Sequence, residues 1–189
     1  MKPATGDLVV DSELSLVPRR PDDAREMFAL IDAHRAALTE WVTWVDATFS
    51  VDDVRRYASF AQSQFEQSSG FEYSVRENGV IAGGIGLYHL DWASRMGHVG
   101  YWLAPAARGR GLITRAARAL TTRAFAELNL HRLEIRCVVE NHKSRAVAER
   151  LGYSSEGFLK EAYLLHGRFR DLALYAMLRE RWKPRASIA

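Results

Sequence analysis

The stretch HVGYWLAPAARGRGLITRAAR, from His98 to Arg118, predicts a strand, a basic turn and a helix in succession. Residues alternate between two faces from His98 to Leu103, as in a half-buried strand, and Pro105 ends this pattern. Gly109 and Gly111 permit a tight turn, and the helix that follows begins with backbone amides that lack internal partners. The spacing therefore predicts a turn that can cradle a ligand.

The chemistry of this turn favours a phosphate group. Unpaired amides and the positive end of the helix dipole attract an anion, and Arg108 and Arg110 add formal charge. A dinucleotide-binding loop fits less well, because Thr114 stands where G-x-G-x-x-G needs its third glycine and the acidic residue Glu134 opens the next strand instead of closing it. No G-x-x-x-x-G-K-S/T string occurs, which excludes a P-loop. A solvated basic turn is the remaining alternative.

Two strings carry a resemblance to a known family. YWLAP followed by ARGRGLITRA resembles the acetyl-CoA-binding segment of the GCN5-related N-acetyltransferase superfamily, and more narrowly the branch that acetylates ribosomal-protein N-termini. Ala106 departs from the superfamily pattern, which has Gln or Arg at this position. The string NHKSRAVAERLGY, from Asn141 to Tyr153, follows at the expected distance, and the resemblance covers roughly residues 14 to 180.

The resemblance implies a fold and a co-substrate. It implies an α/β (α+β) fold with a mixed, mostly antiparallel central sheet flanked by helices, and direct transfer from acetyl-CoA within a ternary complex, without a metal. In the family the central strand and the next parallel strand splay apart, and the pantetheine arm lies in the gap. The residues that the resemblance assigns to acetyl-CoA binding are Leu103, Arg108, Gly109, Arg110, Gly111, Leu112, Ile113, Thr114, Asn141 and Lys143.

Composition fits one globular domain spanning residues 1–189. Hydrophobic residues make up 48% and charged residues 26% of the chain, which argues against extended disorder. The net charge of +3 does not call for a nucleic-acid partner. Cys137 is the one cysteine, so an intramolecular disulfide is impossible and a reducing cytoplasm is the expected setting. The N-terminus has no apolar leader and no run is long enough for a membrane span, so we expect a soluble cytoplasmic protein.

Hydrophobic alternation and turn residues outline the rest of the sheet. Strands are predicted at 13–17, 71–76, 80–90, 98–103, 133–139, 157–165 and 170–178, with Asn-Gly at a hairpin after residue 77. Strand, helix and strand between residues 98 and 139 predict a right-handed parallel crossover. Gly83, Gly84 and Gly86 either permit twist and close packing or leave room for a ligand, and the sequence does not decide between these.

Short stretches of sequence also predict the helices. Asp22 is a candidate cap for a helix to about Arg35, an amphipathic helix is predicted from Val51 to Gln67, and a further helix begins at Leu112. Asn141 is expected to cap a helix that Gly152 ends. Trp41 and Trp44 either pack in the core or, as the resemblance implies for this region, also face the acceptor groove.

Acetyl transfer needs a base for the amine and a proton for the departing thiolate. His98 is the candidate base, because imidazole titrates near neutrality, and an ordinary strand-face histidine is the alternative. The reserve candidates for the base are His89, Asp91, Glu72 and Glu161.

Ser144 is the candidate acid by analogy. Many superfamily members place a Tyr seven residues after the Asn, where this chain has Ala148. Asn141 and Ser144 can bind the pantetheine amides and the sulfur, or can serve only as a helix cap and its first turn. Cys137 is expected to be a small buried residue, which disfavours a covalent acetyl-cysteine route.

The sequence thus predicts an acetyl-CoA-dependent N-acetyltransferase. The resemblance makes a protein N-terminal α-amine the first choice of acceptor, with a ribosomal-protein N-terminus as the partner. A small-molecule amine such as a polyamine or aminoglycoside is the second choice, and a non-catalytic CoA-binding module is the rival class. Direct contact with nucleic acid or a membrane is not expected, and a homodimer is common among relatives.

Overall fold

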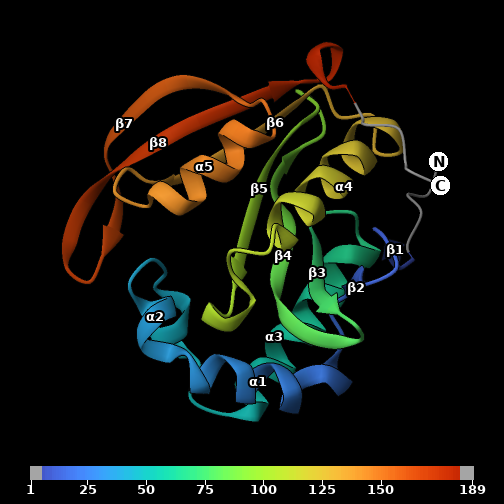
Figure 1. Ribbon diagram of the computed structural model, residues 1–189, viewed down its shortest axis with the longest axis vertical. Helices are drawn as coiled ribbons and strands as arrows, with labels where there is room; N and C mark the ends of the chain where they lie inside the picture. Colours follow the sequence, from blue (N-terminus) through green and yellow to red (C-terminus); the bar gives the residue numbers. More distant parts are fainter. Residues whose placement is uncertain (1–5, 184–189) are drawn as a thin grey trace.

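The computed structural model describes residues 6–183, and its strands form one eight-stranded sheet. The strand order is β1-β2-β3-β4-β5-β6-β8-β7 (Figure 1). The strands are β1 (Leu8–Val9), β2 (Leu14–Pro18), β3 (Phe71–Glu77), β4 (Val80–Asp91), β5 (Met96–Leu103), β6 (Arg132–Val138), β7 (Ser154–Leu165) and β8 (Arg168–Leu178). Within the described residues β5 and β6 are the parallel pair and the other neighbours are antiparallel, which confirms the predicted mixed sheet.

Helices flank both faces of this sheet. They are α1 (Ala24–Ala33), α2 (Arg35–Thr39), α3 (Val51–Glu66), α4 (Leu112–Ala126) and α5 (His142–Arg150). The core under α4 and α5 includes Val99 and Leu103 of β5, whereas Trp102, on the opposite face of that strand, packs with the cluster from α1 to α3. None of the helices within residues 6–183 has the length and hydropathy needed to span a bilayer. Residues 1–5, part of the segment where no leader was expected, lie outside the described residues.

Capping residues explain several helix boundaries. The Asn141 side chain accepts a 3.0 Å hydrogen bond from the Ser144 amide at the start of α5, and Gly152 follows the helix with φ 82°, as predicted. Asp22 was predicted to cap the first helix, but it does not. It lies inside a 3-10 turn that precedes α1, and that turn receives no side-chain cap. The first helix also ends at Ala33, before a separate short α2.

The parallel pair separates along its length. Backbone pairing joins Met96 to Arg132, Gly97 to Leu133 and His98 to Glu134, and the paired register stops there. From Val99 on β5 and Ile135 on β6 onward, both strands instead line a cavity. The splayed strands that the resemblance implied are therefore present.

The glycines of β4 make room for side chains. A Cβ at Gly84 would lie 2.6 Å from Nη2 of Arg19 and 2.7 Å from Nε1 of Trp102. A Cβ at Gly86 would lie 2.9 Å from the Tyr88 hydroxyl oxygen. Of the two roles left open by the sequence, close packing is the one that these positions serve.

Candidate active site

A cavity of about 1680 Å³ lies where β5 and β6 part. Its wall takes residues from the segment between α1 and α3 on one side and from the N-terminal ends of α4 and α5 on the other. Ligand pockets usually measure about 300–1,000 Å³, so this cavity has room for two substrates at once.

The glycine turn forms one end of the cavity. Gly109 and Gly111 have φ values of 81° and 75°, and the first turn of α4 follows directly. The left-handed glycines form a tight turn, and unpaired amides at the start of the next helix, with its dipole, favour an anion. Nine of the ten residues that were assigned to acetyl-CoA line the cavity: Leu103, Arg108, Gly109, Gly111, Leu112, Ile113, Thr114, Asn141 and Lys143.

The two arginines of the turn differ. Arg108 lines the cavity, and its Nε donates a 3.1 Å hydrogen bond to the Leu103 carbonyl oxygen at the end of β5. Arg110 is absent from the lining, and its Nη1 donates a 2.7 Å hydrogen bond to the Glu77 carboxylate. The structure therefore places Arg110 apart from the other nine residues, because Glu77 on β3 binds its guanidinium group.

Ser144 lies in the cavity wall beside a residue that the sequence did not single out. Its Oγ donates a 3.1 Å hydrogen bond to the hydroxyl oxygen of Tyr101, and that hydroxyl donates to the Ser144 carbonyl oxygen, also at 3.1 Å. Burial raises the pKa of the Tyr101 hydroxyl, so the phenol stays protonated at neutral pH. Strand alternation placed Tyr101 on the face that α5 covers, but not how close it would lie to Ser144.

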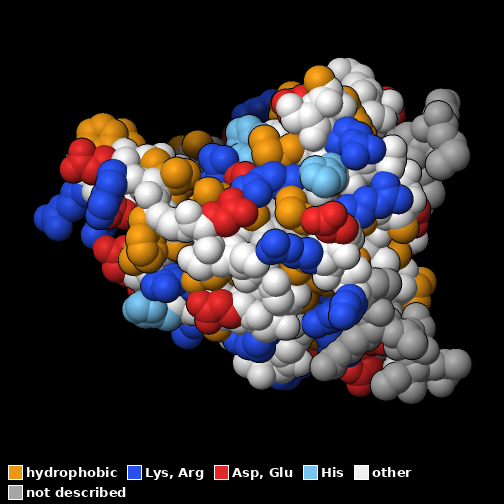
Figure 2. All heavy atoms as spheres, turned by 90° about the horizontal axis from the view of Figure 1, so that it is seen from above, with side chains coloured by type: hydrophobic (Ala, Val, Ile, Leu, Met, Phe, Trp, Pro, Cys, Tyr) orange, Lys and Arg blue, Asp and Glu red, His pale blue; other side chains and the backbone are white. Residues whose placement is uncertain are grey.

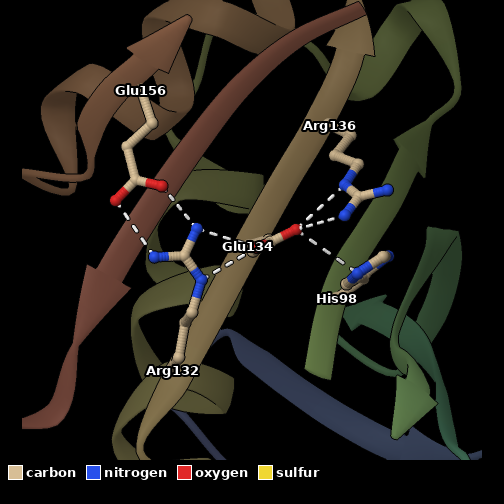
Figure 3. Close-up of polar contacts among 5 residues, drawn as sticks. All are labelled: His98, Arg132, Glu134, Arg136 and Glu156. Carbon is tan, nitrogen blue, oxygen red and sulfur yellow. Dashed lines mark hydrogen bonds and ion pairs between the residues drawn. The ribbon is translucent and has the colours of Figure 1, made fainter. Parts of the chain in front are cut away.

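His98 lies on β5 outside the cavity lining. Its Nε2 is 3.4 Å from the Glu134 carboxylate, which also accepts hydrogen bonds from Arg132 and Arg136, as Figure 3 shows. Arg132 in turn binds Glu156 of β7. Burial, followed by the charge of Arg136, lowers the pKa of His98 to about 4. The imidazole is therefore neutral at pH 7, and the structure does not bring it together with Ser144.

The other half of the cavity is aromatic. Trp41 and Trp44 both line it, and the Trp44 ring packs against Trp102 of β5, with the centroids 5.6 Å apart and the rings tilted by 54°. Trp44 is 37% exposed, so it packs with one face and meets the cavity with another. Tyr57 of α3 also lines this half, and its hydroxyl donates a 2.6 Å hydrogen bond to the buried Glu72 carboxylate.

Charges of both signs are mixed on the face of the molecule seen from above. Figure 2 shows lysine and arginine side chains interspersed with aspartate and glutamate, without a large area of one sign. This distribution agrees with the small net charge of +3.

A family model described as an acetyltransferase (GNAT) domain matches residues 13–154. The chain belongs to the GNAT acetyltransferase family. Its turn, its splayed strands and its two-part cavity fit a protein of this family that uses acetyl-CoA as co-substrate. No group of metal-ligating side chains occurs within residues 6–183.

This acetyltransferase is similar to named relatives over most of its length. YdaF of Bacillus subtilis (strain 168), named as a candidate ribosomal N-acetyltransferase, is 33% identical over 175 residues, which cover 92% of this chain and 96% of YdaF. The ribosomal-protein-serine acetyltransferase of Escherichia coli (strain K12) is 25% identical over 174 residues, 92% and 97% of the two chains. The microcin C7 self-immunity acetyltransferase MccE, solved with acetyl-CoA and AMP, superposes with a TM-score of 0.86 at 25% identity, covering 89% and 94%.

The reserve bases of the acetyltransferase separate in space. Glu72 lines the cavity, whereas His89, Asp91 and Glu161 do not. The backbone amide of Glu161 donates a 2.9 Å hydrogen bond to Asp171 at an irregular point of β7, and Tyr163 reaches the cavity in its place.

Cys137 differs from the expected buried residue. It is partly exposed and lines the cavity near Ser144. Burial of its sulfur nevertheless raises the pKa of the thiol above its ordinary value, against an opposing hydrogen bond with Ser144. A raised pKa leaves little thiolate at neutral pH, so Cys137 is a poor nucleophile in the acetyltransferase.

Proposed function

We propose that this acetyltransferase transfers the acetyl group of acetyl-CoA to the N-terminal α-amine of a protein, as the ribosomal-protein acetyltransferases do, in the cytoplasm. The observation that carries the proposal is the single cavity that joins the glycine turn to the tryptophan-lined half. The names of its two relatives support an acceptor of the ribosomal-protein type.

The residues of the cavity supply the parts that direct transfer needs. Bound acetyl-CoA supplies the thioester, whose carbon–sulfur bond breaks as the amine forms the new carbon–nitrogen bond. Arg108 and the amides after Gly111 neutralise its anionic end, and Asn141 and Lys143 line the path between them and Ser144. We assign the proton for the departing thiolate to Ser144 Oγ, which donates it to Tyr101 in this structure and turns toward the sulfur when acetyl-CoA reacts. The role of His98 as the base stays a prediction.

We call the tryptophan-lined half of the cavity the acceptor half. Its charges favour an α-amine over a polyamine as the acceptor. The lining carboxylates there are Asp53 and Glu72, and each has an arginine beside it, Arg56 and Arg19 respectively. A polycation needs several unpaired carboxylates, because each ammonium group that leaves water must be compensated. A chain with one N-terminal ammonium group needs only one carboxylate, and Glu72 lies 3.7 Å from Nε of Arg19 without a hydrogen bond from it.

Labelled acetyl-CoA added to a cell extract containing ribosomes tests the proposal. We expect the wild-type protein to label the N-terminal residue of one or a few proteins, located by peptide mass spectrometry. Gly111→Val, which disrupts the turn that binds acetyl-CoA, is the matched control and should label none. Label on small amines alone, or binding of acetyl-CoA without release of free thiol for any amine, would contradict the proposal.

A further inference from the structure

Two opposite charges, those of Arg19 and Glu72, are buried in the wall of the acceptor half of the cavity. Arg19 is 8% and Glu72 3% exposed, and Nε of Arg19 lies 3.7 Å from a Glu72 carboxylate oxygen. This Nε is fully buried and has no hydrogen-bond partner among residues 6–183. A buried ion pair repays its desolvation only when its remaining donors and acceptors are hydrogen-bonded, so this pair is incomplete as it stands.

Two tyrosine hydroxyls hold the Glu72 carboxylate. Tyr57 donates its 2.6 Å hydrogen bond to one Glu72 oxygen, and the Arg19 guanidinium lies 5.5 Å from the centroid of the Tyr57 ring. Burial, followed by the charge of Glu72, raises the pKa of both Tyr57 and Tyr88, so both hydroxyls stay protonated. All four of these side chains line the cavity.

The N–H donors of Arg19 and Trp102 lie near Gly84, which is two residues along β4 from the position opposite Glu72. Strand pairing sets Glu72 opposite Gly86 and Ser74 opposite Gly84, two residues away on β4. Arg19 Nη2 and Trp102 Nε1 both crowd the space above Gly84, while Tyr88 covers Gly86. The Glu72 carboxylate and the two N–H donors therefore lie over sheet positions that are one two-residue step of a strand apart, roughly 7 Å between backbone positions.

We propose that Glu72 and Arg19 form the subsite that binds the N-terminal residue of the acceptor. Glu72 accepts hydrogen bonds from the ammonium group before it loses its proton, and Arg19, with Trp102, donates to the carbonyl oxygen of the same residue. A lysine side chain or a polyamine has no carbonyl group beside its amine, so it leaves the Arg19 donors unpaired. The inference rests on the proposed function and supplies a reason for selection of α-amines.

Two peptides separate the roles of the two residues. One has a free N-terminus, and the other is the same peptide carrying an aminovaleryl group, which sets four carbons between the amine and the first carbonyl. We expect Arg19→Gln to lower kcat/KM for the first peptide by roughly ten- to hundredfold and to change the second less than threefold. Glu72→Gln should lower kcat/KM for both peptides.

The neighbouring Arg20 is a matched control. Its side chain is 57% exposed and pairs with Asp7 instead of the cavity, so Arg20→Gln should leave the ratio of the two kcat/KM values unchanged. Calorimetric titration with acetyl-CoA should give wild-type affinity for each variant and shows that it is folded. Tyr57→Phe, which removes one hydrogen bond from Glu72, is the milder variant and should lower both kcat/KM values severalfold.

The outcomes distinguish the subsite from the proposed function. If the wild type acetylates the free N-terminus but Arg19→Gln changes both peptides equally or neither, the subsite is wrong and the proposed function stands. If the wild type acetylates neither peptide but does acetylate spermidine, the proposed function fails and the subsite fails with it. A fall in the kcat/KM ratio confined to Arg19→Gln supports both.

Discussion

The Ser144 hydroxyl donates a 3.1 Å hydrogen bond to the Tyr101 hydroxyl, which joins the first turn of α5 to the central strand β5. The return bond from Tyr101 to the Ser144 carbonyl oxygen, also 3.1 Å, fixes the same two elements twice. Both residues line the cavity where β5 and β6 part. The candidate proton donor is thus held by a strand and a helix together in the wall of the cavity.

Ser144→Ala should lower kcat by about a hundredfold and leave the KM for acetyl-CoA nearly unchanged, because a leaving-group proton matters only as the thiolate develops. Steady-state kinetics with varied acetyl-CoA measures both constants. Tyr101→Phe should cost less, since Asn141 still holds the Ser144 amide. An unchanged kcat in Ser144→Ala would leave Ser144 with a capping role alone.

Gly111→Val should weaken acetyl-CoA binding far more than Arg110→Ala. A β-branched residue is strained at φ 75°, although a Cβ there meets no protein atom within 4 Å, and Arg110 is bound to Glu77 outside the cavity. Arg108→Ala should fall between the two, because Arg108 lines the cavity. Calorimetric titration of the three folded variants gives the order, and normal binding by Gly111→Val would refute the phosphate-binding role of the turn.

His98 should make the fold sensitive to acid. Its pKa of about 4 lies below the ordinary 6.5, so protons bind the unfolded chain more readily in that interval. The His98 contribution to stability is therefore present above about pH 6.5 and is lost as pH falls toward about 4. Urea unfolding across this range should show a smaller slope with pH in His98→Asn than in the wild type. An exposed control, His131→Asn, should keep the wild-type slope.

Rate against pH tests the other role of His98. If His98 is the base for the amine, the rate of His98→Ala relative to the wild type should be lowest at low pH, where more of the acceptor is protonated. A ratio of rates near one at every pH would leave His98 as a structural residue of the Glu134 cluster.

Two adjacent glycines should respond differently to alanine. A Cβ at Gly83 would overlap the Trp102 carbonyl oxygen, so Gly83→Ala should lower the free energy of unfolding by about 1–3 kcal/mol. A Cβ at Gly84 meets only the ends of the Arg19 and Trp102 side chains. Gly84→Ala should therefore keep more stability but raise the KM for a peptide acceptor. Thermal unfolding and peptide kinetics on both variants check this, and equal effects on both quantities would contradict it.

Local signals in the sequence predicted seven of the eight strands, missing β1, and predicted the glycine turn at one end of the cavity, whereas the mixed sheet came from the resemblance. Asn141 caps α5 and Gly109 with Gly111 form the turn because these roles depend on a few consecutive residues. The Asn-Gly hairpin after Glu77 also lies where the sequence placed it.

Contacts between residues far apart in the sequence could not be predicted from local patterns. Arg110 binds Glu77 across 33 positions, and Tyr101 meets Ser144 across 43. The buried pair of Arg19 and Glu72 depends on how β2 lies beside β3, which no local pattern specifies. In the sequence, the acceptor half was therefore visible only as two tryptophans and the reserve base Glu72.

A competition between two peptides tests transfer to an α-amine. Equal amounts of a peptide with a free N-terminus and of the same sequence, N-terminally blocked and bearing a lysine, share one reaction with acetyl-CoA. An α-amine reaches its neutral form about 2.4 pKa units more easily than a lysine amine. We expect mass spectrometry to find the acetyl group on the free N-terminus and little on the lysine. Equal or preferential acetylation of the blocked peptide would contradict this expectation.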